Sequence, residues 1–127
     1  MYANRLQAYE QENREVVSGP ELEAEVLTST ARQLAEIRGD WDAEDRDDRL
    51  FAALKRNQRL WTFFQGELTN PEHPMPANVR QNLLNLSLFV DKRTFELMAE
   101  PAPEKLNILI EINKNIAAGL RENSQAA

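Results

Sequence analysis

The sequence predicts an all-α fold, an antiparallel bundle of about five helices that forms a single domain over residues 1–127. Three observations support this prediction. The length of 127 residues is typical of one domain, and a hydrophobic fraction of 42% is sufficient for a core. The chain has only four glycines, and no stretch alternates apolar and polar residues as a strand does. Apolar residues instead recur at helical spacing, in segments separated by glycine or proline.

The first predicted helix covers about residues 2–16. Its apolar side is a narrow seam at helical spacing, made of Tyr2, Leu6, Tyr9, Asn13 and Val16. Two of these five positions are tyrosine and one is asparagine, so the seam has little apolar area to hold the helix in place. Two interpretations remain open: a terminal helix docked on the core, or a mobile arm over residues 1–17 that moves aside for a partner.

The second predicted helix begins at residues 18–21 and runs to about Arg38. Ser18 can cap it, Pro20 fits the first turn, and Glu21 completes a Ser-x-x-Glu capping box. Gly39 is well placed to end it. Its predicted core positions are Val26, Leu27, Leu34 and Ile37.

An acidic segment over residues 40–48 precedes the third predicted helix, which covers about residues 45–68. An EF-hand template that starts at Asp40 fails, because its glycine position falls on Asp45 and its last ligand on Phe51. The acidic residues are therefore interpreted as a solvated loop and a first helical turn. The predicted core face of the third helix consists of Leu50, Ala53, Leu54, Leu60, Trp61, Phe64 and Leu68.

The fourth predicted helix covers about residues 76–99, after a loop with three prolines that cannot continue a helix. It is apolar on two sides, so it lies either at the centre of the bundle or with one side reserved for a partner helix. One stripe consists of Val79, Leu83, Leu86, Val90 and Leu97, and the other of Leu84, Leu88 and Phe95.

The fifth predicted helix runs from Pro103 to about Arg121, and residues 122–127 are expected to form a frayed tail. Its predicted core face consists of Leu106, Leu109, Ile110, Ile116, Ala117 and Leu120, while Ile108, Ile112 and Gly119 line another side. Asn57 and Asn113 interrupt core faces of the third and fifth helices. A buried amide without partners costs about 1–3 kcal/mol, so each is expected to be hydrogen-bonded, with loop backbone as one candidate partner, and to fix helix register.

Residues for catalysis or metal binding are missing from the sequence pattern. The chain has no cysteine, and its one histidine, His73, lies in a proline-rich loop without a partner at metal-ligand spacing. No phosphate-binding loop, dinucleotide-binding glycine motif or nucleophile elbow occurs. The prediction is therefore no enzyme, no cofactor and no metal site.

The charge pattern disfavours nucleic acid as a partner. The net charge is −6, whereas nonspecific nucleic-acid binding needs basic charge. The third helix does carry Arg46, Arg49, Lys55, Arg56 and Arg59, but acidic residues alternate with them at its start, as on a solvated face. DNA is excluded as a partner, and an RNA contact is the less favoured interpretation. No apolar run has the length of a signal peptide core or a membrane span, so a cytoplasmic location without membrane insertion is expected.

The apolar residues that the main core stripes do not use predict a protein partner. A small helical protein with surplus apolar helix surface and no chemistry is typical of a binding protein, and a partner helix in an apolar groove is one common mode. The predicted partner-binding residues are Phe51, Phe63, Leu84, Leu88, Phe95, Ile108 and Ile112, together with Tyr2, Leu6 and Tyr9 of the first seam.

Five sequence blocks resemble the flagellar biosynthesis regulator family FlaF of alphaproteobacteria. They are Asn57-x-x-Leu60-Trp61, Pro76-x-x-x-Arg80, Asn82-Leu83-x-x-Leu86-x-Leu88-Phe89-Val90, Thr94, and Ile112-Asn113-x-x-Ile116-Ala117-x-Gly119-Leu120. The opening is similar to the start of the flagellin export chaperone family FliS, in Tyr2-Ala3-Asn4, Ala8-Tyr9 and Ser18-Gly19-Pro20-Glu21-Leu22.

The two resemblances imply a FliS-like bundle and a cytoplasmic chaperone that binds the helical terminal region of flagellin. Such a chaperone keeps unpolymerised flagellin export-competent and couples secretion to synthesis. The FlaF resemblance also implies an alternative, a regulator of flagellin translation that acts through the regulator FlbT or directly on flagellin mRNA.

Overall fold

The computed structural model describes residues 19–126, with side chains described to residue 122. Four α-helices fill this range: α2 (Gly19–Gly39), α3 (Arg46–Leu68), α4 (Ala77–Ala99) and α5 (Leu106–Ala126), with a 3₁₀ turn, η1 (Pro103–Lys105), before α5. The described residues contain no strand, which confirms the all-α prediction. The count of about five helices is wrong for the described chain, which has four. The helix predicted over residues 2–16 lies outside the described residues.

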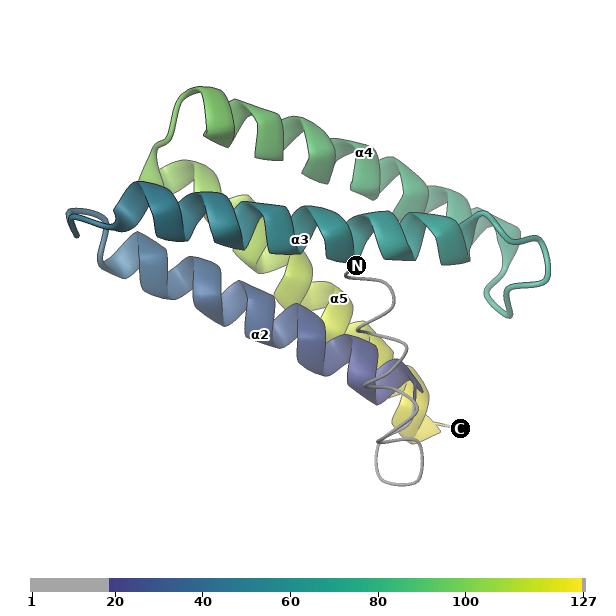
Figure 1. Ribbon diagram of the computed structural model, residues 1–127. Helices are drawn as coiled ribbons and strands as arrows, with labels where there is room; N and C mark the ends of the chain where they lie inside the picture. The colour runs from purple at the N-terminus through teal and green to yellow at the C-terminus, as the bar shows by residue number, and fades with distance from the viewer. Residues whose placement is uncertain (1–18, 127) are drawn as a thin grey trace.

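The helices run alternately up and down, and α3 lies between α2 and α4 (Figure 1). α4 packs on α3, whereas α5 packs chiefly on α2. α5 therefore starts beside the end of α4 and then diverges from it along the bundle (Figure 1). As a result, α4 is supported on one flank by α3 but has little contact with α5 over most of its length.

The core follows the predicted stripes on α2 and α3. All seven apolar core positions predicted on α3 are buried, and on α2 only Val26 is half-buried instead. The stripe on α4 is less well predicted, because Val79 is exposed in the first turn, next to the loop. Val90 and Leu97, further along α4, are buried.

Two hydroxyls complete the core face of α4, and the sequence pattern did not reveal them. Thr94 Oγ1 donates to the Val90 carbonyl at 2.7 Å, and Ser87 Oγ donates to the Leu84 carbonyl at 2.6 Å. Each hydroxyl is therefore satisfied within its own helix and can be buried at little cost.

The turn between α2 and α3 is fixed by charged groups. Arg49 Nη1 lies 3.0 Å from Asp40 Oδ2 and 3.6 Å from Asp45 Oδ1, and the hydrogen bond with Asp40 raises the pKa of this guanidinium. The Arg46 guanidinium lies 4.2 Å from the centre of the Trp41 ring. Asp47 and Asp48 occupy the first turn of α3, where carboxylates stabilise the helix dipole, as the sequence indicated.

Arg80 fixes the loop between α3 and α4. Its Nη1 donates to the carbonyls of Leu68 at 3.4 Å and Asn70 at 3.3 Å, and its Nε donates to the Met75 carbonyl at 3.2 Å. Arg80 thereby satisfies the Leu68 carbonyl, which the end of α3 leaves without a helical partner, and two carbonyls of the loop. Pro76 immediately precedes α4 in an extended conformation, which suits a proline there.

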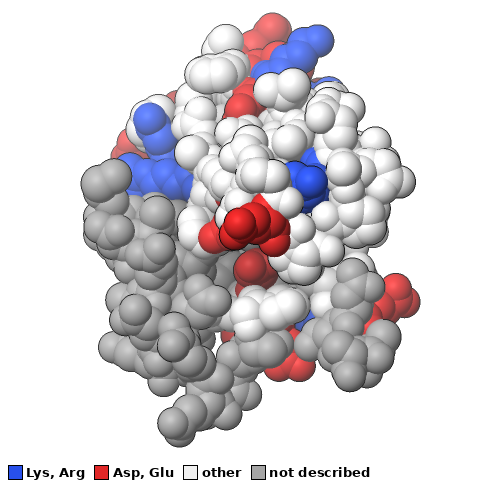
Figure 2. Space-filling view, turned by 90° about the vertical axis from the view of Figure 1, so that its right-hand side faces the viewer, with Lys and Arg blue, Asp and Glu red and all other residues white. Residues whose placement is uncertain are grey.

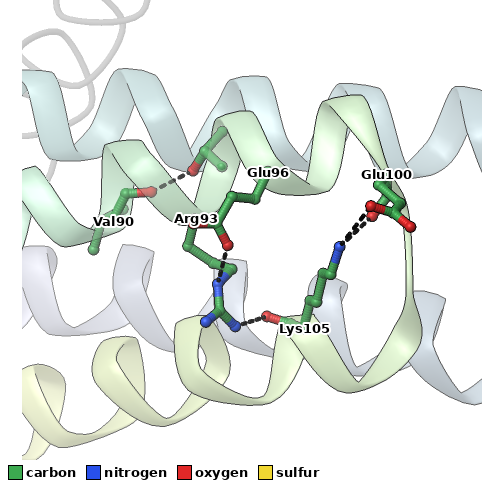
Figure 3. Close-up of polar contacts among 6 residues, drawn as sticks. Val90, Arg93, Glu96, Glu100 and Lys105 are labelled. Carbon is green, nitrogen blue, oxygen red and sulfur yellow. Dashed lines mark hydrogen bonds and ion pairs between the residues drawn. The ribbon is translucent and has the colours of Figure 1, made fainter.

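The connection from α4 to α5 is held by two basic side chains (Figure 3). Arg93 forms an ion pair with Glu96 at 3.2 Å, and its Nη1 donates to the Lys105 carbonyl at 3.2 Å. Lys105 Nζ donates in turn to the Glu100 carbonyl at 2.8 Å. α5 then extends to Ala126 rather than ending near Arg121, because residues 122–126 contain neither glycine nor proline.

Candidate protein-binding surface

A buried polar cluster joins α3 to α5. Asn113 Nδ2 donates to Asn57 Oδ1 at 2.8 Å, and Trp61 Nε1 donates to Asn113 Oδ1 at 3.0 Å. All three side chains are buried. The prediction that both asparagines are hydrogen-bonded is confirmed, although they bond to each other rather than to loop backbone. The cluster is satisfied except for Asn57 Nδ2, which has no partner in the structure.

The ten residues predicted to bind a partner fall into four groups. Tyr2, Leu6 and Tyr9 lie outside the described residues. The side chains of Phe51, Leu88 and Phe95 are 54%, 66% and 61% exposed, and Ile108 is 38% exposed. Phe63 and Leu84 are half-buried and pack against the core. Ile112 belongs to the core, so its assignment to a side outside the core is wrong.

Ile112 is buried because the core face of α5 is broader than a single stripe. α5 contacts α2 along its length and is joined to α3 through Asn113, the next residue. A helix that packs against two neighbours buries a wide arc of its surface, which here includes position 112.

One seam of α4 borders α3 on the outside of the bundle. Its five positions follow the spacing i, i+4, i+7, i+11 and i+14, which lies along one side of a helix: Leu84, Leu88, Asp91, Phe95 and Met98. Asp91 shows that this seam adjoins α3, because Gln65 Nε2 donates to Asp91 Oδ2 at 3.2 Å and to Ser87 Oγ at 3.0 Å.

Phe51 extends this seam onto α3. Phe51 and Leu54 share a surface hollow with Leu97, Met98 and Pro101 at the end of α4. Phe51, Leu84, Leu88, Phe95 and Met98 therefore form one apolar strip along the α3–α4 junction, which we name the α3–α4 surface. Leu88 and Phe95 are two turns apart, about 10 Å along the helix axis.

The charges beside the α3–α4 surface are mixed. Lys55 Nζ lies 5.5 Å from the centre of the Phe51 ring, and Lys92 is exposed on α4. Asp47 lines the hollow at Phe51, and Asp91 lies within the seam. Two positive and two negative groups balance each other here, so apolar contact rather than net charge characterises this surface.

Phe89 is an exposed aromatic residue that the predicted site omitted. It is 37% exposed, and the Arg93 guanidinium lies 5.5 Å from the centre of its ring. Because Arg93 also bonds to Lys105, Phe89 lies on the flank of α4 that faces away from the α3–α4 surface. Its position three residues after Leu86 was the available signal, since that spacing makes Phe89 a neighbour of Leu86 at the edge of the first apolar stripe.

The basic residues of α3 are partly engaged within the bundle. Arg56 Nη1 donates to Gln33 Oε1 at 3.0 Å, and Arg56 Nη2 donates to Ser29 Oγ at 3.1 Å, which ties α3 to α2. Arg59 is exposed. The guanidinium of Arg56 therefore has a structural role, whereas Arg59 and the half-exposed Lys55 are the outward basic groups in this part of the helix.

The one histidine of the chain, His73, has a structural role in its loop. His73 Nδ1 accepts a hydrogen bond from the Met75 backbone N–H at 3.2 Å, as part of the loop turn. Within residues 19–126, no three His, Asp or Glu side chains come together in a way that could hold a metal ion. None of the described helices is long and apolar enough to span a membrane.

The structure thus defines a small all-α protein with a hydrogen-bonded core and an apolar outer strip. A family model described as flagellar protein FlaF matches residues 5–120, nearly the whole chain, so the chain belongs to the FlaF flagellar protein family. This membership gives the protein a flagellum-related function. No curated protein and no solved structure matches the chain.

Proposed function

We propose that this protein is a cytoplasmic, non-enzymatic chaperone for flagellin secretion. It binds the helical terminal region of unpolymerised flagellin, keeps it export-competent and couples its secretion to its synthesis. The observation that carries the proposal is the α3–α4 surface, where Phe51, Leu88 and Phe95 are each more than half exposed. Membership of a flagellar protein family supports flagellin as the partner.

The shape of the α3–α4 surface suits an amphipathic helix. A helix laid along α4 would meet Leu88 and Phe95 at a two-turn interval, and Phe51 would extend the contact at one end. The terminal helices of flagellin are amphipathic and disordered when free, so they become ordered on such a host and lose conformational entropy when they bind. Aromatic and large aliphatic side chains supply most of the free energy that compensates for this loss.

The FliS-like start of the sequence adds a further element to the proposal. A FliS-like arrangement would give residues 1–17 the role of an arm that moves aside when flagellin binds. Tyr2, Leu6 and Tyr9 would then exchange contacts on the chaperone for contacts with flagellin. These residues lie outside the described structure, and the argument for the arm is the weak apolar seam of the sequence.

The test is calorimetric titration of the purified protein with monomeric flagellin at two salt concentrations. We expect 1:1 binding with a negative heat-capacity change and little dependence on salt, because apolar surface is buried. The double substitution Leu88→Ser and Phe95→Ser is expected to weaken binding at least tenfold. The matched control, Val79→Ser with Phe89→Ser, removes two exposed apolar side chains elsewhere on α4 and should change the affinity less than threefold.

Equal losses of affinity in the two double variants would contradict the assignment of the surface. Absence of binding by the unsubstituted protein would contradict the chaperone function itself. In that case the titrations would turn to FlbT and to flagellin mRNA.

The alternative function is regulation of flagellin translation, through FlbT or directly on flagellin mRNA. The specific observation in its favour is the exposed guanidinium of Arg59, with Lys55 one turn before it on α3. Direct RNA binding predicts a steep salt dependence and a loss of affinity in Arg59→Gln. Arg56→Gln is a less clean test, because Arg56 also ties α3 to α2.

A further inference from the structure

The end of the bundle opposite η1 contains an apolar hollow outside the α3–α4 surface. Its apolar lining comes from the last turns of α3, the following loop, α4 and the second half of α5: Trp61, Phe64, Met75, Leu83, Ile116 and Leu120. We name it the end hollow. It encloses about 450 Å³, its open mouth included.

The end hollow exists because two helices diverge. α4 and α5 are held together at η1 by Arg93 and Lys105, and they separate toward the opposite end (Figure 1). No described helix fills the widening space, so Met75, Leu83, Ile116 and Leu120 are only half-buried. Figure 2 looks onto this end, and most of the described atoms there are uncharged, with acidic side chains near the middle. An apolar hollow of this kind favours an apolar occupant.

The chain itself supplies a segment of suitable length and position. The described structure begins at Gly19, and Glu23, one helical turn later, lies at the hollow. Val16 precedes Gly19 by three residues and can therefore lie no more than about 10 Å from it. A helix over residues 2–16 is about 22 Å long, and its seam of Tyr2, Leu6, Tyr9 and Val16 would face the hollow.

The charges of the segment and of the hollow are mixed. Glu23 and Glu67 contribute carboxylates to the lining of the hollow. Arg5 directly precedes the seam residue Leu6, and Arg14 lies two residues before Val16. Residues 2–16 also carry Glu10, Glu12 and Glu15, so their net charge is −1, against −6 for a whole second copy of this chain. The attachment of the segment at Gly19, close to the hollow, therefore favours it as the occupant more than charge does.

We propose that the end hollow is the docking site of residues 2–16 of the same chain. Leu6 and Tyr9 insert between Met75 of the loop and Ile116 of α5, and the segment forms the fifth helix of the bundle. The second occupant to consider, a copy of this chain, gives a different result in the test below. Flagellin takes no part in the docking itself. Failure of this proposal would remove the arm from the proposed function but would leave flagellin binding at the α3–α4 surface untouched.

Disulfide trapping in the full-length protein tests this proposal directly, because the chain has no cysteine of its own. The test variant carries Leu6→Cys and Met75→Cys. The control carries Leu6→Cys and Ala118→Cys, since Ala118 is exposed on α5 between hollow residues Ile116 and Leu120 but is not among the residues that line the hollow. If residues 1–18 were undocked, position 6 could reach position 75 or position 118 from Gly19. A difference between the two rates of disulfide formation therefore reports docking rather than proximity alone.

We expect the intramolecular disulfide to form at least ten times faster in the Met75 variant than in the Ala118 variant. Equal rates would overturn the proposal, and a disulfide that joins two copies would assign the hollow to a second copy instead. A second measurement uses amide hydrogen exchange of Leu6→Ser with Tyr9→Ser. Exchange at the end of α3 and over residues 114–121 should rise at least fivefold, while the off-seam control Gln7→Ser with Gln11→Ser leaves it unchanged. Unchanged exchange in both variants would also overturn the proposal.

Discussion

Replacing Asn113 with leucine should destabilise the protein far more than the same replacement of Asn57. Leucine shares the branched shape of asparagine, so the change removes hydrogen-bonding groups, and its larger side chain adds a packing cost of similar size at the two buried positions. In Asn113→Leu, Trp61 Nε1 and Asn57 Oδ1 both lose their partners. Each buried polar group without a partner costs about 1–3 kcal/mol, and the added apolar contact offsets part of this cost. We therefore expect Asn113→Leu to lower the free energy of unfolding by about 3 kcal/mol.

Asn57→Leu should lower the stability of the protein much less than Asn113→Leu, for a reason specific to this structure. It leaves one orphan, Asn113 Nδ2, but it also removes Asn57 Nδ2, which already lacks a partner. The two effects have similar size and opposite sign. The expected net change in the free energy of unfolding from hydrogen bonding is therefore within about 1 kcal/mol. The double variant leaves only Trp61 Nε1 without a partner. It should therefore be about 1–2 kcal/mol more stable than Asn113→Leu alone, a negative coupling in the double-mutant cycle.

The assay is urea unfolding followed by far-ultraviolet circular dichroism, because the fluorescence of Trp61 is itself perturbed. In a thermal scan, a loss of about 3 kcal/mol corresponds to a decrease in Tm of roughly 12 °C for a domain of this size. Asn115→Leu is the matched control, since Asn115 is exposed on the same helix, and it should change stability by less than about 0.5 kcal/mol. If Asn57→Leu destabilises as much as Asn113→Leu, or if the two effects simply add, the reasoning about orphaned groups is wrong.

Three further predictions concern the loop, the outer surface and the first segment. Arg80→Met removes the donor for three loop carbonyls and should cost about 1–2 kcal/mol, with faster amide exchange over residues 69–76 in mass spectrometry. Phe95→Ser should change the free energy of unfolding by less than about 1 kcal/mol in urea, because this ring is 61% exposed; a larger loss would mean that it supports the fold. Deletion of residues 1–17 should leave the far-ultraviolet spectrum helical yet change flagellin affinity in calorimetry, and unaltered affinity or an unfolded product would contradict the arm.

The sequence predicted the helices well because their boundaries have local causes. Gly39 ends α2, the prolines at 71, 74 and 76 separate α3 from α4, and the start of η1 coincides with Pro103. The end of α5 was predicted too early, because charged and amide residues were interpreted as a tail although none of them breaks a helix. Local signals thus predicted the helix boundaries to within a few residues, except at the end of α5, where no helix-breaking residue is present.

The arrangement of the helices was beyond the reach of periodicity, and this limited the predicted site. A second apolar stripe on α4 was visible, but periodicity alone left open whether it packs in the centre of the bundle or faces solvent. The structure shows both outcomes along one seam, since Leu84 is half-buried whereas Leu88 and Phe95 are exposed. Ile112 shows the opposite error, because the contact of α5 with two neighbours widens its core face. Such differences depend on tertiary packing, which a single-helix pattern does not contain.

The residues that carry the FlaF resemblance are mostly structural in this fold, so they do not by themselves point to a binding site. Asn57, Trp61 and Asn113 join α3 to α5, and Arg80 closes the loop after α3. Leu88 is different, because it lies in the same sequence block as buried Val90 yet is 66% exposed. A large exposed leucine does not stabilise the core, and the proposed function assigns Leu88 to partner binding. Substitution at Leu88 should therefore affect partner binding without affecting stability, whereas substitution at Asn113 should affect stability first.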